Sequence, residues 1–464
     1  MRRQISHGKK AERPKEDGLS RAEFLRAAFC SSAVVCLPRV NAESGVAEFV
    51  AADKSHNEDN ESHSLIASSP VLQNAAETSI GVAFAVSGLA SGWVDLSLSP
   101  QMTNAKRYYS GEGGIMDIND KIALVRIRNL KPSTRYYYRI GANRINYQDC
   151  YNIQNLGPEV DNKVHSFRTL GPGLDGSFCV INDTHEAKDA LGRVYAKLAE
   201  LKPSVVIWNG DASNDSETME RAMGVFIHPH SDYPEYASDT PYMFVNGNHD
   251  FRGLFNRHLK DLMMMRDASE RSGRFASLGR NFVQRFGDVA LIGLDTGEDK
   301  LDENPLMAGI FQMKEYRELQ TQWLAEEIEK PAIKNARYKV VCCHIPLFDP
   351  RADANPGDLA PCDTAPSYQF DFAIWQRTCS EMWGPLFEKA GVDLVICGHQ
   401  HKFRYDPPSE TRMWAQIVGG GPYVSQDKAD EFPTVVEGRV ENGRLDVLVH
   451  DVANSQVVGS YSFS

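Results

Sequence analysis

Five short apolar segments after residue 176 are each followed by a cluster of polar residues. The segments have the length of buried strands, and they are SFCVI, SVVIW, PYMFV, KVVCC and DLVIC. Stretches with helical spacing lie between them, such as the one that places Leu191, Val194 and Leu198 on one face. The chain closes with two predicted antiparallel strands turned by Asn442-Gly443. The alternation predicts an α/β domain over 177–464, with one or two sheets flanked by helices.

Residues 70–170 show a different pattern. Short runs of alternating or β-branched residues, such as GWVDLSLS and KIALVRIR, are separated by Gly, Asn and Pro. This spacing predicts an N-terminal all-β sandwich, so the chain is expected to be multidomain. A Gly/Pro-rich stretch at 171–176 separates the two predicted domains. The segment NLKPSTRYYYRIG resembles the fibronectin type III pattern, in which Tyr136 would be the corner tyrosine.

The first 42 residues have the features of a signal peptide. A basic stretch is followed by the mostly apolar, small-residue run 27–37 and by a small-residue cleavage site at 40–42. Residues 43–69 are polar and acidic, as in a linker. We therefore expect an exported protein, located in the periplasm, at the cell surface or outside the cell. The alternative for the N-terminus is a frayed helical end of the folded protein.

The charge distribution limits the possible partners. The chain has 464 residues and a net charge of −12. Its first 42 residues hold nine Lys/Arg and four Asp/Glu, so the remainder carries −17. Such an acidic body repels polyanions, which argues against nucleic acid as the main partner. No apolar run reaches the length of about 18 residues that a transmembrane helix needs, so no transmembrane segment is expected.

The nine cysteines do not form a disulfide framework, because their spacing is irregular. Cys30 and Cys36 lie in the predicted signal peptide. Cys362 and Cys379 flank an irregular segment and are the one candidate pair for a disulfide. Four others lie in apolar runs and are expected to be buried free thiols: Cys179, Cys342, Cys343 and Cys397.

The polar clusters are candidates for a single site. Ligands bind beyond the carboxyl ends of parallel strands, so the clusters can converge in one crevice. Their oxygen and imidazole donors suit Mn, Fe or Zn better than a soft thiolate site would. Each cluster alone could be a turn or a helix cap, and a single histidine could be a core residue. Five at successive strand ends favour a site: 182–185, 210–211, 247–250, His344 and 398–401.

The motifs DTH, GD, GNHD, H and GHQH, in this order over residues 183–401, resemble the calcineurin-like metallophosphoesterase superfamily. Together with the predicted sandwich, they resemble the domain arrangement of purple acid phosphatases and their bacterial relatives. The chain departs from that pattern at Asn214, where purple acid phosphatases place a metal-bound tyrosine. His185 would take the place of that tyrosine, so the violet iron-tyrosinate colour is not implied.

The resemblance implies two metal ions of Fe, Mn or Zn and a bridging hydroxide as the nucleophile. Asp211 would bridge the two ions. His249 would protonate the leaving group or stabilise charge on the phosphoryl group, and Asp250 would fix the tautomer of His249. A helix cap is the alternative role for Asp250. The remaining ligands would be Asp183, His185 and His401 for the first ion and Asn248, His344 and His399 for the second.

The function implied is an exported phosphoesterase with a dinuclear metal centre. It would act on a small phosphorylated substrate, either a phosphate monoester or a diester. A phosphodiesterase or a nucleotidase on the same centre is the nearest alternative. A protein of another class would use the sandwich to bind a surface partner and would keep the metal domain only as structure.

Overall fold

The computed structural model describes residues 64–464 with a few gaps. The predicted signal peptide, the predicted linker up to residue 63 and Cys362 lie outside the described residues. The gaps are 175, 230–232, 234, 236, 266–272, 350–367 and 426–429, and side chains are also left out at 368–373.

The region before the Gly/Pro-rich stretch consists of strands in two layers. One layer is a sheet in the order β10-β8-β3-β4, with β9 paired to β8, and the other contains β1, β2 and β7. A separate hairpin joins β5 to β6. The strands are β1 (Val71–Gln73), β2 (Ile80–Ala85), β3 (Ala90–Ser97), β4 (Lys106–Tyr109), β5 (Gly111–Glu112), β6 (Ile115–Met116), β7 (Ile122–Ile127), β8 (Arg135–Asp149), β9 (Asn152–Val160) and β10 (His165–Arg168).

Buried apolar and aromatic side chains hold these strands together. Val94, Tyr138 and Phe84 are fully buried in the apolar core of this region. The hydroxyl of Tyr136 accepts a hydrogen bond from the backbone N–H of Lys131 at 2.9 Å, which is the contact expected of a corner tyrosine. Leu65 is also buried, so the last residues of the predicted linker pack against the strands.

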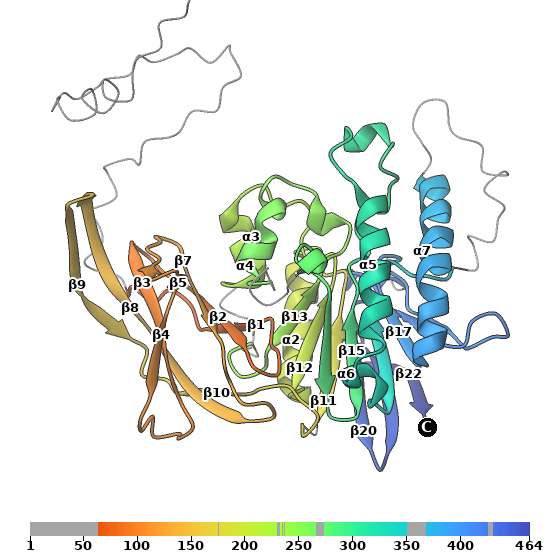
Figure 1. Cartoon of the computed structure of the whole chain (residues 1–464), viewed down its shortest axis with the longest axis horizontal. Coiled ribbons are helices and arrows are strands. Elements are labelled where there is room, and N and C mark those ends of the chain that lie inside the picture. The colour runs from red at the N-terminus through yellow and green to blue at the C-terminus, as the bar shows by residue number, and fades with distance from the viewer. Residues whose placement is uncertain are drawn as a thin grey trace, which may run out of the picture. The chain divides into compact units, whose positions relative to one another are not determined.

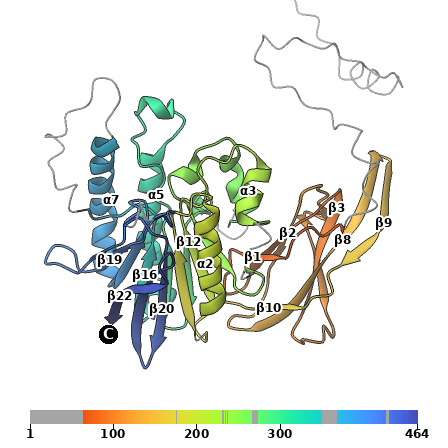
Figure 2. The ribbon, with the colours of Figure 1, turned by 180° about the vertical axis from the view of Figure 1, so that it is seen from behind.

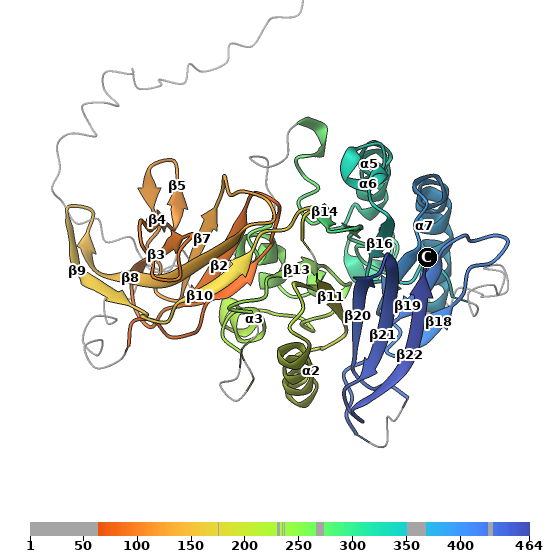
Figure 3. The same cartoon turned by 90° about the horizontal axis from the view of Figure 1, so that it is seen from below.

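Residues 177–464 form two sheets, which confirms the predicted mixed α/β fold. The first sheet extends in the order β22-β21-β20-β11-β12-β13, and the second is β14-β15-β16-β17-β19-β18. Figure 3 shows β20, β21 and β22 side by side. The strands are β11 (Ser177–Ile181), β12 (Val205–Asn209), β13 (Tyr242–Val245), β14 (Phe282–Phe286), β15 (Val289–Gly293), β16 (Tyr338–Cys342), β17 (Leu394–Cys397), β18 (Arg404–Asp406), β19 (Ala415–Val418), β20 (Thr434–Glu441), β21 (Arg444–Asp451) and β22 (Gln456–Phe463).

Helices flank the two sheets on their outer faces. Leu191, Val194 and Leu198 of α2 pack against the first sheet, as Figure 2 shows for the helix. Trp323 of α5 and Phe387 of α7 pack against the second sheet, and Figure 1 shows these two helices side by side. Among the residues that the structure describes, the helices of more than four residues are α2 (Lys188–Leu201), α3 (Met219–Phe226), α5 (Met313–Glu327) and α7 (Tyr368–Ala390).

Short helical turns fill the connections. Within the described ranges, no helix combines the length and apolar character that a membrane span needs. The predicted closing hairpin is present, since β20 pairs with β21 and Asn442 and Gly443 both have positive φ. The short turns are η2 (His249–Phe251), η3 (Phe255–His258), α4 (Leu259–Leu262), η4 (Gly273–Phe275), η5 (Pro305–Met307) and α6 (Pro331–Lys334).

The N-terminal strands continue the first sheet of the α/β region. β1 pairs with β13 in parallel through Gln73 and Tyr242, so the sheet has nine strands and ends at β7. The Gly/Pro-rich stretch between the two predicted domains is also bound to the α/β region. The N–H of Gly171 donates to the carbonyl oxygen of Arg285 at 2.9 Å. The sequence patterns gave no sign of either connection.

Candidate metal centre

Two sheet edges meet where the predicted polar clusters lie. The parallel strands β11, β12 and β13 end next to the first three clusters, and β16 and β17 end next to the other two. Asn209 joins the edges, because its Nδ2 donates to the carbonyl oxygens of Cys343 and Ile396, each at 3.1 Å. The strand order therefore brings all five clusters to one place.

Asp183, His185 and His401 form the first group of possible ligands, with their ligand atoms all within 4.8 Å of one another. The Nε2 atoms of His185 and His401 lie 2.9 Å apart, and they lie 3.8 and 3.3 Å from Oδ1 of Asp183. Oδ1 of Asn214 lies 2.9 Å from Nδ1 of His185. A hydrogen on Nδ1 would leave the lone pair of His185 Nε2 available to a cation.

Asp211, His344 and His399 form the second group. Oδ1 of Asn248 lies 2.9 Å from Nδ1 of His399, so the asparagine belongs to the same cluster. Nδ1 of His344 lies 2.9 Å from the carbonyl oxygen of Asn209. Because a carbonyl only accepts, Nδ1 carries a hydrogen, which leaves Nε2 as the nitrogen that could bind a cation in place of a proton.

Asp211 faces both groups. Its Oδ2 lies 3.6 Å from Nε2 of His185 and 3.1 Å from Nε2 of His344. Its Oδ1 accepts from the backbone N–H of His249 at 2.9 Å, which fixes the carboxylate. This is the position that a carboxylate shared by two cations would need.

Metal ions would satisfy these nitrogen and oxygen atoms better than the contacts that the atoms make with one another. Nε2 of His344 is buried and has no hydrogen-bond partner among the described residues, because its short distance to Asp211 lacks hydrogen-bond geometry. A buried polar atom without a partner costs free energy. A cation would satisfy this nitrogen together with the close pair of His185 and His401, and oxygen and imidazole donors suit Mn, Fe or Zn.

Backbone strain is concentrated at these side chains. Left-handed backbone costs a non-glycine residue about 1–3 kcal/mol, and such residues gather at functional sites. Because this strain lowers stability, its presence at several neighbouring residues indicates that their side chains are positioned for a function. The residues with positive φ are Asp183 (49°), His185 (45°), Asp211 (48°), His399 (71°) and His401 (57°).

Two glycines allow the carboxylates to approach the backbone. A Cβ atom at Gly247 would lie 2.2 Å from Oδ1 of Asp211, and one at Gly398 would lie 2.3 Å from Oδ2 of Asp183. Neither distance is possible for a real side chain. The glycines of GNHD and GHQH are therefore required by packing against the two carboxylates.

Burial and charge shift the pKa values in this centre. Burial lowers the pKa of His344, but the carboxylates of Asp211 and Asp183 outweigh burial and raise it to about 10. Burial raises the pKa of Asp211, yet His344 outweighs burial and holds it well below the usual range. Burial and the charge of His344 lower the pKa of His399 to about 3. Ionised carboxylates beside imidazoles give the centre the donors that a cation needs.

His249 forms a third group of possible ligands with His185 and Asp211, but other atoms hold its ring. Nδ1 lies 3.1 Å from the carbonyl oxygen of Asn214, and Nε2 lies 3.1 Å from Nη1 of Arg252. Burial is the main cause of a lowered pKa for His249, and the charge of Asp211 opposes it. The ring is thus fixed between a carbonyl and a guanidinium.

Asp250 does not make the expected contact with the ring of His249. Its Oδ2 instead accepts from the backbone N–H groups of Asp211 and Gly247, each at 2.8 Å. Burial and the charge of Asp211 raise the pKa of Asp250 to about 7. The physical reason is that this buried carboxyl group satisfies the backbone of two turns, and the Asn214 carbonyl occupies the place expected for it.

Glu298 and Asp299 extend the centre and were not among the predicted site residues. Both are buried, and both accept hydrogen bonds from Nη2 of Arg252, at 2.7 and 3.1 Å. Oδ2 of Asp299 lies 3.9 Å from Nε2 of His399, where it can orient that ring. A signal was present, because the two residues follow an apolar run, VALIGL, as the other clusters do.

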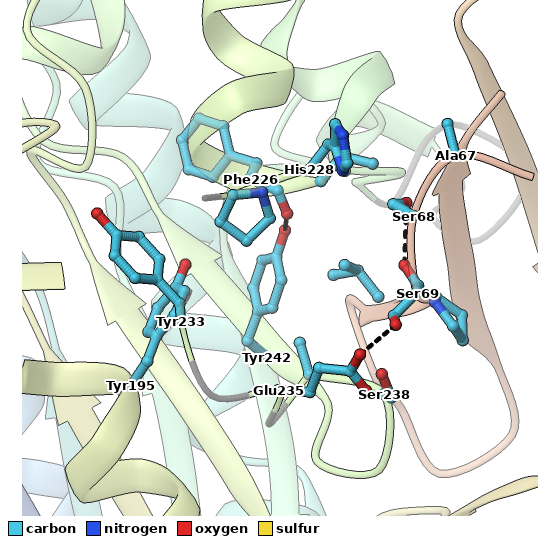
Figure 4. Close-up of a pocket in the computed structure, with 15 residues that line it drawn as sticks. Ala67, Ser68, Ser69, Tyr195, Phe226, His228, Tyr233, Glu235, Ser238 and Tyr242 are labelled. Atoms are coloured by element: carbon cyan, nitrogen blue, oxygen red, sulfur yellow. Dashed lines mark hydrogen bonds between the residues drawn. The ribbon is translucent and has the colours of Figure 1, made fainter. Parts of the chain in front are cut away.

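A cavity of about 250 Å³ lies between the residues before β1 and those around α3 and β13 (Figure 4). The hydroxyl of Tyr242 donates to the carbonyl oxygen of Phe226 at 3.3 Å, and Oγ of Ser69 donates to Glu235 at 2.5 Å. The walls are mostly apolar and none of the residues belongs to either group of possible ligands. We assign no role to this cavity.

Comparisons with known proteins agree with the geometry. Residues 176–403 match the family model of calcineurin-like phosphoesterases. The purple acid phosphatase PPD1 from seeds of yellow lupin (Lupinus luteus) has a TM-score of 0.57 at 14% identity, over 85% of this chain and 74% of its own. The structure of PhoD has a TM-score of 0.51 at 12% identity, over 85% of this chain and 88% of its own. No curated protein sequence matches the chain significantly. At these identities the two structures share a fold with the chain.

Proposed function

We propose that this chain, whose residues 176–403 match the family model of calcineurin-like phosphoesterases, is a metal-dependent phosphoesterase that hydrolyses phosphate monoesters or diesters at a centre of two metal ions. One observation carries the proposal. Two groups of buried and partly buried donor atoms lie next to each other, and Asp211 of the second group also faces His185 of the first. A single metal ion would need only one of these groups.

The ligands follow from the two groups. Asp211 would bridge the ions, and Asn248 would complete the second set because it lies next to His399. The first ion would be held by Asp183, His185 and His401, and the second by Asn248, His344 and His399.

Two bound cations would supply a water of lowered pKa and would neutralise charge on the phosphoryl oxygens. The protein's own residues position these groups. Asn214 and Asn209 fix the tautomers of His185 and His344, and Asp250 holds the turns that carry Asp211 and the GNHD motif. His249 would act on the leaving group, because it lies beside Asp211 without being needed in either ligand set.

The test is metal analysis of the purified full chain beside turnover of 4-nitrophenyl phosphate and bis(4-nitrophenyl) phosphate. We expect two equivalents of Fe, Mn or Zn, loss of turnover with a chelator, and recovery when metal is restored. The two esters distinguish a monoesterase from a diesterase, and a panel of nucleotides identifies a nucleotidase.

Asp211→Asn gives the sharper arm of this test. Removing a negative charge shared by two cations should release metal and abolish turnover. Asp215→Asn is the matched control, because Asp215 is exposed and pairs with Arg221 at the surface. Full metal content with normal turnover in Asp211→Asn would contradict the two-metal proposal. Two metals without turnover of any ester would favour a structural metal domain in a binding protein.

The N-terminal strands and the export signal belong to the same proposal. A fibronectin type III-like sandwich is supported by the hydrogen bond from Lys131 to the hydroxyl of Tyr136. Export rests on the signal-like pattern of residues 1–42. Sequencing the N-terminus of the mature protein tests it, since cleavage after Ala42 is expected and an intact Met1 would contradict it.

A further inference from the structure

A second cavity, of about 540 Å³, lies beside the candidate metal centre and has an unusual charge. We call it the cationic pocket. Three of its residues are cations, Arg257, Lys260 and Arg280, and Asp261 is the one acidic residue in its wall. The rest of the wall consists of Phe251, Met265, Ala276, Ser277, Gly279, Phe311 and Met313.

The protein neutralises these three cations only in part, since Arg280 lies close enough to the buried Asp295 to oppose the rise in its pKa that burial causes. Across the described ranges, none of them forms an ion pair, whereas Arg252, Arg274 and Lys300 nearby in the sequence all do. Nε of Arg280 is also buried without a hydrogen-bond partner in the part of the chain that the structure describes. The pocket wall therefore carries three cations and one carboxylate in a chain with a net charge of −12, and this local excess of positive charge favours an anion from outside.

Aromatic rings hold the two guanidinium groups in place. The guanidinium of Arg280 lies 4.8 Å from the ring centre of Phe251, and that of Arg257 lies 5.5 Å from the ring centre of Phe311. A guanidinium that lies on a ring keeps its N–H groups in the plane and directed away from the ring. This arrangement suits a phosphate or carboxylate, which binds a guanidinium through two parallel hydrogen bonds.

The pocket shares its walls with the metal centre. Phe251 lies on the same short turn, η2, as His249. Met313 packs against Gly297, with its sulfur 2.7 Å from the position of a Cβ atom there, and Gly297 directly precedes Glu298 and Asp299. The two segments that carry His249 and Asp299 thus adjoin both the pocket and the metal centre.

We propose that the cationic pocket binds a second anionic group, a phosphate or a carboxylate, of the phosphoester that is hydrolysed at the metal centre. This inference rests on the proposed function. The preferred substrates are then molecules with two separated anionic groups, one cleaved and one held in the pocket. A simple aryl phosphate lacks the second group and uses only the metal centre.

The test compares substrates that differ only in the distal group. Alkane-1,ω-diol bisphosphates of increasing length are compared with alkyl monophosphates of the same length, and the KM ratio of the two is measured for the full chain. We expect an optimal length at which the bisphosphate has the lower KM by about tenfold or more, as one charge-assisted hydrogen bond can provide.

Arg257→Gln and Lys260→Gln should each bring this KM ratio closer to one, by about tenfold for the arginine. Lys314→Gln is the matched control. Lys314 is an exposed residue of α5 next to Met313, and it does not belong to the pocket wall. Its loss should therefore leave the KM ratio at the wild-type value. Thermal midpoints identify a variant that does not fold, and the second variant then carries the test.

The outcomes separate the pocket from the catalytic proposal. A KM ratio of one at every length, or a ratio that neither variant changes, would overturn the inference even if 4-nitrophenyl phosphate is hydrolysed. Calorimetry with inorganic phosphate distinguishes a free ion from a substrate group. Phosphate binding that Arg257→Gln weakens, without any bisphosphate preference, would show a site for a free anion and overturn the substrate assignment. Absence of all ester hydrolysis would contradict the proposed function, and phosphate binding would still test the pocket.

Discussion

Arg252 and His249 share a hydrogen bond beside the candidate metal centre, with Nη1 of the guanidinium 3.1 Å from Nε2 of the imidazole. A guanidinium only donates, so Nε2 is the acceptor. Nδ1 faces the carbonyl oxygen of Asn214 at 3.1 Å and therefore carries the hydrogen. In this tautomer Nε2 has no proton, so His249 must gain one before it can protonate a leaving group through this atom.

His249→Ala should separate catalysis from metal binding. We expect metal content to stay at the wild-type level while kcat for an alkyl phosphate falls by about 10² to 10⁴, the range for loss of one general acid. The loss should be smaller for an aryl phosphate, because an aryl oxide leaves without protonation. Equal losses on the two esters would point to charge stabilisation, and loss of metal would make His249 a ligand or a structural residue.

Arg252→Gln tests whether the guanidinium positions His249. The change removes the contact with Nε2 and the ion pairs with Glu298 and Asp299. We expect kcat for alkyl phosphates to fall about tenfold, with partial recovery in Arg252→Lys, and the dependence on leaving group to shift toward that of His249→Ala. Arg274→Gln is the control, since that residue pairs with Glu326 at the surface. An unchanged dependence on leaving group would show that Arg252 does not act through His249.

Gly398→Ala should lower the metal content of the protein without unfolding it. The new Cβ atom would lie 2.3 Å from Oδ2 of Asp183, so the carboxylate has to move. We expect loss of at least one equivalent of metal. Gly224→Ala is the control, because a Cβ atom there meets nothing within 4 Å and alanine favours the helix α3. Normal metal content in Gly398→Ala would show that Asp183 is not a ligand.

Asp95 predicts a pH dependence of stability away from the metal centre. Burial alone would raise the pKa of Asp95, but hydrogen bonds and ion pairs with Arg107 and Arg139 hold it below its usual value of 3.8. Because the folded pKa is lowered, the stabilisation is present above about pH 4 and is lost as the pH falls through the folded value. Asp95→Asn should lower the free energy of unfolding by about 2 kcal/mol at pH 7.

The measurement is urea unfolding of wild type and Asp95→Asn at pH 7 and pH 3. The difference between the two proteins should shrink at pH 3, because the unfolded wild-type chain takes up a proton at Asp95 there and part of the stabilisation is lost. Asp117→Asn, at an exposed site, is the control and should show no difference at either pH. A difference of the same size at both pH values would show that the ion pairs do not stabilise the fold.

The ligand groups could be predicted because each donor directly follows a strand. Once apolar runs identify β11 and β12, their parallel order brings Asp183 and Asp211 to one sheet edge. The GHQH motif follows β17 of the second sheet and reaches the site through the contact between the two sheets. Glu298 and Asp299 follow β15 in the same way, but acidic residues after a strand are also typical of ordinary turns. Only their burial and the contact with Arg252 distinguish them.

Contacts between residues far apart in the sequence could not be predicted. The role of Asp250 depends on which backbone N–H groups its turn approaches, and that is set by packing rather than by the GNHD pattern. The cationic pocket combines residues of η3, α4 and α5 whose individual patterns are those of ordinary surface residues. The positive charges of these residues indicate a binding site only after the fold shows that they surround one cavity.

The junction between β1 and β13 has a consequence for how such a chain can change over generations. Gln73 and Tyr242 pair across it, and the carbonyl oxygen of Tyr242 accepts from the N–H of Asn74 at 2.8 Å. A gene rearrangement that removed everything before Gly173 would leave β13 as an open edge, and open edges recruit strands from other molecules. Recombination therefore cannot remove or replace the N-terminal strands without exposing the edge of β13. A replacement has to bring its own strand to cap the catalytic sheet.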